Sequence, residues 1–353
     1  VLKSDKINLT DSISINNYFM YLVSNDKNTK YNLEWNNKTV PNNAGKLFGR
    51  AIFENNTANI SYEQFFLTVR DSTWNMVTSG NTVIDSTGSL TVNPLVFVNG
   101  VQKLSINGNL SNAPKDKLVF QLANFDLLQL SPFIGDAIDV KGIVDGNFSL
   151  QKTMGNIAFS SKLNFSKLNI NDNNLGEGVL NTEYFNADKY IYLDGSTSLG
   201  FTNFNGDLIK NLSFNGYYYL DKTEESLDIN VDANPANLKL LNRYLAGILS
   251  LKPCLVVGSA KITGTPAKPA INGKFKIVMC EMKIDYLNVT YNVIGNIEVM
   301  PDQIRFEDLK IGDDLTKKTV FNGTLNGNIF HDNFKNMRID YDLNFKNMLV
   351  LNK

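Results

Sequence analysis

Few side chains in this chain of 353 residues have the type and spacing that catalysis requires. His331 is the only histidine, so a metal site or an activated serine would lack the partners that such chemistry needs. Asp313 and Asp314 are adjacent, so on an extended chain they point to opposite faces and supply too few oxygens for calcium. No phosphate-binding glycine loop is present. We therefore expect no enzyme, no cofactor and no metal, and we interpret His331 as a polar residue at a strand end.

Aromatic stacking against a sugar ring is a second kind of candidate chemistry. Trp35, Trp74 and the run Tyr217–Tyr219 supply rings of the required type. Aromatic residues are also ordinary strand formers, so the sequence favours a structural role for them. A secreted β-sandwich adhesin or glycan-binding protein remains an alternative, and it requires that the apolar faces close into a dry core.

The two cysteines could form one disulfide but not a framework of several. In the hairpin that carries them, alternation of apolar residues pairs Val256 with Ile277. The same register places Cys254 opposite Met279 and turns Cys280 to the other face of the sheet. A bridge between the two cysteines would therefore need a bulge or a change of register.

Alternation of apolar and polar residues with a period of two is the dominant pattern and predicts half-buried strands. It is clearest over residues 337–345 and recurs at 227–231 and 118–122. Two further strands, 297–299 and 304–306, are separated by a short segment with turn residues. Because these strands follow one another directly along the chain, an antiparallel meander is the expected topology.

Only one segment, Asn237–Leu249, has a clear helical period of apolar residues. Its counterpart at Asn124–Ile138 contains Pro132, which predicts a shorter or broken helix. The expected class is thus all-β with short amphipathic helices. Strands with one apolar face must pack against a second sheet, close into a barrel, or leave an apolar concave surface.

A phrase ending in Asn-Gly occurs three times, at 104–108, 212–216 and 319–323. Its glycines are 108 and 107 residues apart, which indicates a repeated module and favours an elongated array. We expect each glycine to lie where a strand enters the sheet. The predicted segments are a divergent N-terminal one, a first repeat module and a longer second module, at residues 1–100, 101–211 and 212–353.

The charge balance argues against a nucleic-acid partner. The chain has 34 basic and 35 acidic residues, which are interspersed and leave a formal net charge of −1. No run of about 18 apolar residues is present to span a bilayer as a helix. Any signal peptide or membrane anchor is expected outside this sequence.

The alternating apolar face is the remaining candidate for function. It could be a dry core or the lining of an open groove for lipid, and alternation alone does not distinguish the two. The candidate lining residues are Leu118, Phe120, Leu122, Phe148, Leu150, Leu227, Ile229, Val231, Val256, Ile262, Phe275, Ile277, Met279, Ile304, Phe306, Met337, Ile339, Tyr341, Leu343 and Phe345.

The chain carries a series of weak motifs in a fixed order: Trp74–Met76, Ile106–Gly108, Phe125–Leu130, Gly264–Gly273, Leu287, Tyr291, Ile304–Phe306, Asp314, Gly323, Gly327, His331, Phe334 and Met348–Asn352. Together these motifs resemble a known family, the TamB translocation and assembly module proteins in their Bacteroidota form, with the related AsmA-like region. The resemblance covers about residues 60–353, and the second module would lead into the family's C-terminal region. The usual glycine after the aspartate is missing from Asp314–Lys318.

The resemblance implies an antiparallel sheet curled into a U-shaped groove, the β-taco, that crosses the periplasm and conducts phospholipid acyl chains. It further implies an inner-membrane anchor through an N-terminal helix, and an Omp85-type (TamA-like) outer-membrane partner through the C-terminal region. An alternative role is a scaffold that offers strand edges to outer-membrane β-barrel proteins during their assembly.

Overall fold

The computed structural model describes residues 1–8, 14–37, 43–69, 71–78, 80–130, 139–153, 156–186, 188–203, 205–245, 247, 249–313 and 320–349. Its 22 strands belong to one sheet, and every strand pairing described is antiparallel. The all-β class and the antiparallel topology expected from the sequence are therefore confirmed. The chain forms two compact units, residues 1–168 with 181–186 and residues 169–180 with 187–353.

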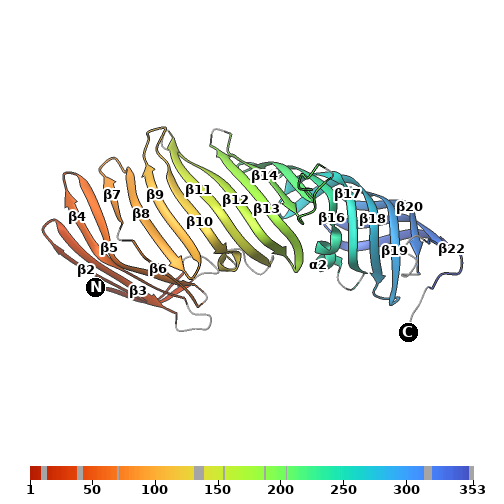
Figure 1. The fold of residues 1–353 in the computed structure, drawn as a ribbon, viewed down its shortest axis with the longest axis horizontal. Coiled ribbons are helices and arrows are strands. Elements are labelled where there is room, and N and C mark those ends of the chain that lie inside the picture. Colours follow the sequence, from red (N-terminus) through yellow and green to blue (C-terminus); the bar gives the residue numbers. More distant parts are fainter. Residues whose placement is uncertain are drawn as a thin grey trace. The chain divides into compact units, whose positions relative to one another are not determined.

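The first unit contains a series of neighbouring strands that follow chain order (Figure 1). The strands up to the boundary are β1 (Leu2–Asn8), β2 (Ser14–Asn25), β3 (Asn28–Asn36), β4 (Ala44–Glu54), β5 (Thr57–Val69), β6 (Ser72–Met76), β7 (Asn81–Asp85), β8 (Leu90–Asn99), β9 (Gln102–Leu110), β10 (Leu118–Asp126), β11 (Val140–Thr153) and β12 (Asn156–Ile170).

One place in this unit departs from simple chain order. Strand β5 pairs with β6 along its C-terminal part and with β7 along its N-terminal part. Strand β8 pairs with the same two short strands from the other side. Together β6 and β7 therefore act as one interrupted strand between β5 and β8.

The second unit contains the strands from β14 onward and residues 173–180 of β13, whose remaining residues belong to the first unit. Its strands are β13 (Asn173–Phe185), β14 (Tyr190–Ser198), β15 (Leu212–Tyr219), β16 (Leu227–Asn237), β17 (Leu249–Thr265), β18 (Lys268–Ile284), β19 (Val289–Val299), β20 (Gln303–Gly312), β21 (Gly323–Asp332) and β22 (Lys335–Phe345).

The helices are much shorter than the sequence pattern predicts. The expected helix at Asn237–Leu249 is reduced to η2 (Leu238–Leu241) and α2 (Asn242–Leu245). Gly247 follows with a φ of +82°, a conformation that ends helices, and β17 begins at Leu249. Of the expected helix at Asn124–Ile138, η1 (Leu127–Leu130) is present, and residues 131–138, with Pro132, lie outside the described residues.

A bulge paired with a glycine recurs along the sheet. In five strand pairs the residue before a one-residue bulge faces a glycine whose φ lies between +114° and +156°. Bulges bend a strand and increase its twist, and glycine permits the matching backbone on the neighbour. The five pairs are Val92–Gly108, Leu122–Gly146, Ala233–Gly258, Ile277–Gly295 and Phe306–Gly327.

The residue before the glycine can satisfy the backbone of the bulge. Asp145 accepts a hydrogen bond from the bulge amide of Asn124 at 2.8 Å, and Asn326 accepts one from that of Asp308 at 2.7 Å. Both bulge residues have a φ of +51°, which Asn and Asp tolerate better than most residues. An Asp-Gly or Asn-Gly step is therefore chemically suited to stand beside a bulge.

This geometry corrects the expected role of the repeated Asn-Gly phrase. Gly108 and Gly216 lie inside β9 and β15, and only Gly323 is the first residue of a strand. Of the three, Gly108 faces the residue before a bulge. The recurring structural unit is thus the bulge with its facing glycine, which within each compact unit returns at intervals much shorter than the spacing of the phrase.

Candidate functional site

The register of the second unit brings the predicted lining residues onto one face. The pairing of Val256 with Ile277 is confirmed. On the following strands, residues that oppose one another also share this side of the sheet: Phe275 opposes Ile297, and Ile297 opposes Phe306. We call this the apolar face. Of the predicted residues it carries Leu227, Ile229, Val231, Val256, Ile262, Phe275, Ile277, Ile304, Phe306, Ile339, Tyr341, Leu343 and Phe345, with Met337 by alternation.

Met279 does not share this face, which corrects the sequence-based assignment. A bulge in β18 after Ile277 shifts the register by one residue, so Met279 opposes Leu255 on the other side of the sheet. The same shift turns Cys280 onto the apolar face, where it opposes Cys254 and forms a disulfide with it. The change of register that a bridge would need is therefore present in β18.

The predicted residues of the first unit also share a face. Leu118 opposes Leu150, and Phe120 opposes Phe148, with their ring centroids 5.7 Å apart. Leu118 is buried in a cluster that includes Trp74, whose ring stacks on Phe125 at 5.4 Å. Trp74 is thus a core residue, which argues against a role for it in sugar binding.

Sequence reasoning missed several residues of these faces. In the second unit they include Val293, Ile297 and Leu309, and in the first unit Leu95 and Phe97. The alternation of Val289, Tyr291, Val293, Ile297 and Val299 along β19 was a detectable signal. The contribution of Leu309 was not detectable, because it depends on the bulge in β20.

The apolar face is buried at one end and partly exposed at the other. Near the disulfide Cys254, Cys280 and Val293 are only 1%, 3% and 2% exposed. Leu238 and Leu245 of the helical turns pack against this cluster, which also includes Met348. Toward the opposite strand ends, side chains such as Ile262 and Ile304 are half-buried. The face therefore combines a closed core with an accessible apolar surface.

Tyr291 fixes the closed end to the segment after β22. Its hydroxyl donates a hydrogen bond to the carbonyl oxygen of Leu349 at 2.8 Å, and burial, with the nearby Asp313 carboxylate, raises its pKa. Asp313 in turn accepts hydrogen bonds from the Asn322 side chain and the Leu349 amide. Asp313 therefore ties chain segments together, and Asp314 lies outside the described residues.

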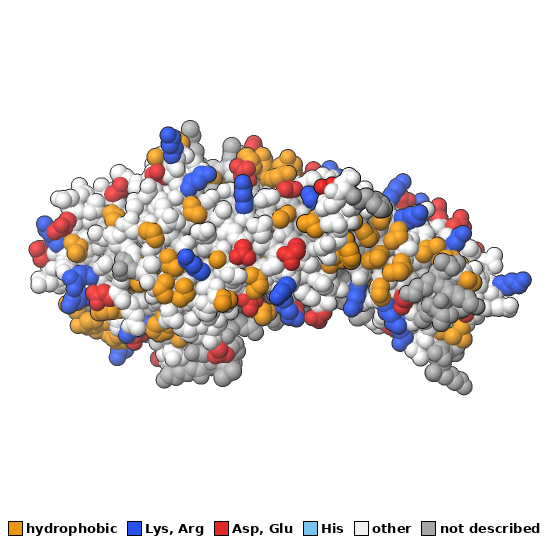
Figure 2. All heavy atoms as spheres, in the orientation of Figure 1, with side chains coloured by type: hydrophobic (Ala, Val, Ile, Leu, Met, Phe, Trp, Pro, Cys, Tyr) orange, Lys and Arg blue, Asp and Glu red, His pale blue; other side chains and the backbone are white. Residues whose placement is uncertain are grey.

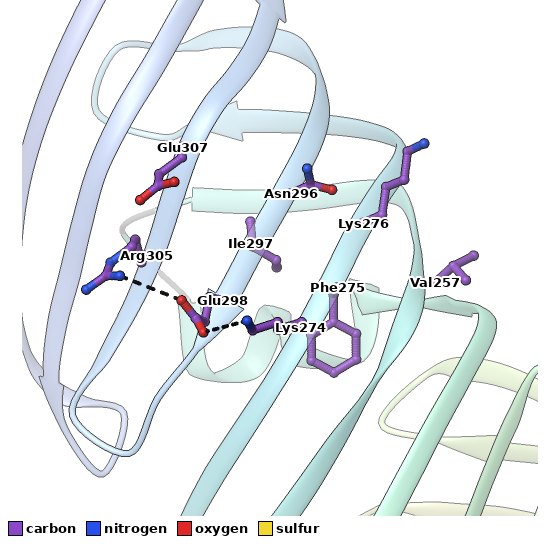
Figure 3. A pocket seen from close by; sticks show the side chains of 9 residues that line it. All are labelled: Val257, Lys274, Phe275, Lys276, Asn296, Ile297, Glu298, Arg305 and Glu307. Atoms are coloured by element: carbon purple, nitrogen blue, oxygen red, sulfur yellow. Dashed lines mark ion pairs between the residues drawn. The ribbon is translucent and has the colours of Figure 1, made fainter.

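The opposite side of the second unit, which we call the polar face, is charged over strands β18–β20. A shallow hollow of about 450 Å³ lies there. Figure 3 shows its lining, in which charged side chains such as Lys276 and Glu307 stand beside uncharged ones such as Val257. Glu298 lies between Lys274 and Arg305, with N–O distances of 3.4 and 3.7 Å. Such exposed ion pairs contribute little stability, about 0–1 kcal/mol each. The two sides of the sheet thus differ sharply in chemistry.

His331 is a buried residue at the end of β21. Its Nδ1 accepts a hydrogen bond from the Phe334 amide at 3.4 Å, and the two rings stack at 4.4 Å. Burial lowers the pKa of the imidazole, with Asp302 and Asp332 opposing this effect. The described residues contain no group of three or more His, Cys, Asp or Glu side chains placed to hold a metal.

Charged side chains of both signs are interspersed with hydrophobic ones on the face seen in Figure 2. Among the described residues, none of the helices has the length and hydrophobicity that crossing a bilayer requires.

The chain matches the family model described as TamB, N-terminal domain, over residues 54–277. This region is well over half of the chain and includes the motifs at Trp74–Met76, Ile106–Gly108 and Gly264–Gly273; the motifs from Leu287 onward lie beyond it. No curated protein matches the chain, and no solved structure matches it. The chain therefore belongs to the TamB family.

Proposed function

We propose that the apolar face of the second unit, with its counterpart in the first, binds the acyl chains of phospholipids and conducts them between the inner and outer membranes. The observation that carries the proposal is the register: predicted lining residues from β16 to β22 share one side of the sheet. Family membership supports the same role. Partial exposure at one end, at Ile262 and Ile304, would give an acyl chain access.

The energetics of lipid transfer favour such a surface. Exposure to water costs about 0.8 kcal/mol per CH₂, so a sixteen-carbon chain faces a barrier of roughly 12 kcal/mol. A continuous apolar surface lowers that barrier because the chain exchanges one apolar contact for another. Aliphatic side chains without fixed polar anchors would also hold the lipid weakly, so that it can move on.

The location and partners belong to the same proposal. We place the protein in the periplasm, tied to the inner membrane by an N-terminal helix and meeting an Omp85-type protein at the outer membrane. A curl of the sheet around its apolar side, the β-taco, would shield acyl chains from water. The bulges and their facing glycines supply local bends of the kind such a curl requires.

The test uses two neighbouring residues on opposite faces of β18. Phe275 is half-buried on the apolar face, and Lys276 is exposed on the polar face. Phe275→Glu places a carboxylate on the proposed path, and Lys276→Glu places the same group outside it. We expect Phe275→Glu to reduce phospholipid binding by the purified chain and to impair outer-membrane lipid supply in cells. Equal effects of the two variants, with both folded by circular dichroism, would contradict the proposal.

A second candidate function is supported by the exposure of β22. Ile339, Tyr341 and Phe345 are 45%, 62% and 43% exposed, and among the described strands β22 pairs with β21. An exposed strand with apolar residues can add another strand, so this edge could hold segments of outer-membrane proteins during assembly. A photocrosslinker at Tyr341 separates the two roles, since it would label phospholipid in one case and unfolded barrel protein in the other.

A further inference from the structure

Four tyrosines come together on the polar face of the second unit. Tyr190 and Tyr192 of β14 oppose Tyr219 and Tyr217 of β15, so the four side chains share one side of the sheet. Ring centroids of Tyr190 and Tyr192 lie 5.1 and 5.4 Å from that of Tyr217. Tyr218, between the two, opposes Ile191 and faces the apolar side. We call the four rings the tyrosine platform.

The platform is part of the surface and is not a closed core. Tyr217 is 38% exposed, and the other three rings are half-buried. Cross-strand aromatic pairs would stabilise the sheet whether the residues were tyrosine or phenylalanine. Tyrosine is distinguished from phenylalanine by a hydroxyl, so the platform offers apolar ring faces together with hydroxyl groups that can exchange hydrogen bonds with a ligand.

Polar groups lie next to the rings on the same face. Tyr217 opposes Asp228, whose carboxylate is 3.0 Å from the Lys261 ammonium. On the next pair along these strands the Asn230 amide donates to the Asn215 oxygen at 3.4 Å. These groups offer both donors and acceptors without a net charge, which suits a ligand that is neutral and rich in hydroxyls.

Lys222 adds a further donor at the edge of the platform. Its ammonium lies 3.5 Å from the centroid of the Tyr219 ring, a cation–π contact. The lysine therefore covers one ring, while the exposed Tyr217 ring stays accessible beside it. A ligand on Tyr217 would come within reach of this ammonium.

We propose that the tyrosine platform binds a neutral oligosaccharide. The apolar face of a pyranose ring stacks on an aromatic ring, and its equatorial hydroxyls reach polar groups at the rim, so the platform and its Asp, Asn and Lys neighbours match both parts of a sugar. Asp194, which opposes Asn215 on the same side of the sheet, balances the charge of Lys222. The absence of a net positive charge at the platform disfavours nucleic acid. β15 already pairs with β14 and β16, so its backbone cannot bind a peptide by strand addition. The site lies on the side opposite the apolar face and does not depend on lipid transfer.

The experiment measures binding of chitotetraose and cellotetraose to the whole chain by ligand-observed NMR and titration. Tyr217→Thr removes the exposed ring and keeps a strand-forming residue, and we expect binding to weaken roughly threefold to tenfold. Tyr217→Phe keeps the ring and should retain most of the binding. Tyr21→Thr is the matched control, because Tyr21 lies on strand β2 with a similar exposure of 43%.

The outcomes distinguish the platform from a structural cluster. Saccharide binding that is lost in Tyr217→Thr and kept in Tyr21→Thr supports the proposal, provided that both variants unfold at the wild-type temperature. Equal loss in both variants would overturn it. If neither saccharide binds the wild type at millimolar concentration, the glycan assignment is wrong and the surface becomes a candidate for protein contact. Phe275→Glu should leave saccharide binding unchanged, which separates this result from the fate of the lipid proposal.

Discussion

Removal of the disulfide should destabilise the second unit by an amount set by the length of the loop that the bond closes. Cys254 and Cys280 are separated by 26 residues, and both sulfurs are buried on the apolar face. For a loop of this length, chain entropy gives a stabilisation of about 3.5 kcal/mol at 25 °C. We expect the double variant Cys254→Ala, Cys280→Ala to lose a large part of this stability. The cavity left by the two missing sulfur atoms should lower the free energy of unfolding further.

The assay can assign the loss to the correct unit. Both tryptophans, Trp35 and Trp74, belong to the first unit, so their fluorescence follows its unfolding, whereas far-ultraviolet circular dichroism follows both units. In urea, the double variant should show an earlier circular dichroism transition and an unshifted fluorescence transition. An unchanged circular dichroism midpoint would refute the reasoning. Alkylation under denaturing conditions, without a reducing agent, should find no free thiol in the wild type.

Three further predictions concern local features. Gly146 has a φ of +139°, and a Cβ added in Gly146→Ala would clash with the Lys162 carbonyl oxygen; in the matched Gly88→Ala, at a φ of +76°, the new Cβ meets no atom. Thermal unfolding should show a loss of stability of several kcal/mol in the first variant and about 1 kcal/mol in the second. Equal losses would contradict the clash. Burial holds the His331 pKa below its usual value of 6.5, so the unfolded chain binds the proton more readily and stability should fall as pH drops below about 6.5. His331→Asn should weaken the dependence of the urea unfolding midpoint on pH across this range. An unchanged pH dependence in this variant would refute the assignment. Asn326→Ala removes the acceptor of the bulge amide and should cost about 1–3 kcal/mol, whereas Asn326→Asp should retain most of the stability in the same measurement.

The sequence predicts the strands and their shared face better than the local breaks in register. Strict alternation over residues 337–345 fixes which side chains share a side, because a one-residue slip would reverse them all. The bulge after Ile277 is not visible in such a pattern, since it requires knowledge of the neighbouring strand. That bulge alone turns Met279 away from the apolar face and lets the two cysteines meet.

The helices and the tyrosine platform show two other limits of sequence reasoning. The apolar period of Asn237–Leu249 is genuine, but a positive φ at Gly247 and the strand that begins at Leu249 leave room for only eight helical residues. The run Tyr217–Tyr219 is visible in the sequence, but its partners Tyr190 and Tyr192 are distant along the chain. Their pairing depends on a register that the intervening loop does not specify.

Lipid conduction by the apolar face is tested most directly by site-specific crosslinking to lipid along one strand. A photoreactive residue is placed in turn at Ile262, on the apolar face, and at its neighbour Lys261, on the polar face. In cells, or with the purified chain and phospholipid vesicles, we expect lipid adducts at Ile262 and few at Lys261. Adducts of equal yield at both positions, or none at Ile262 in a folded chain, would contradict the claim that the apolar face conducts lipid.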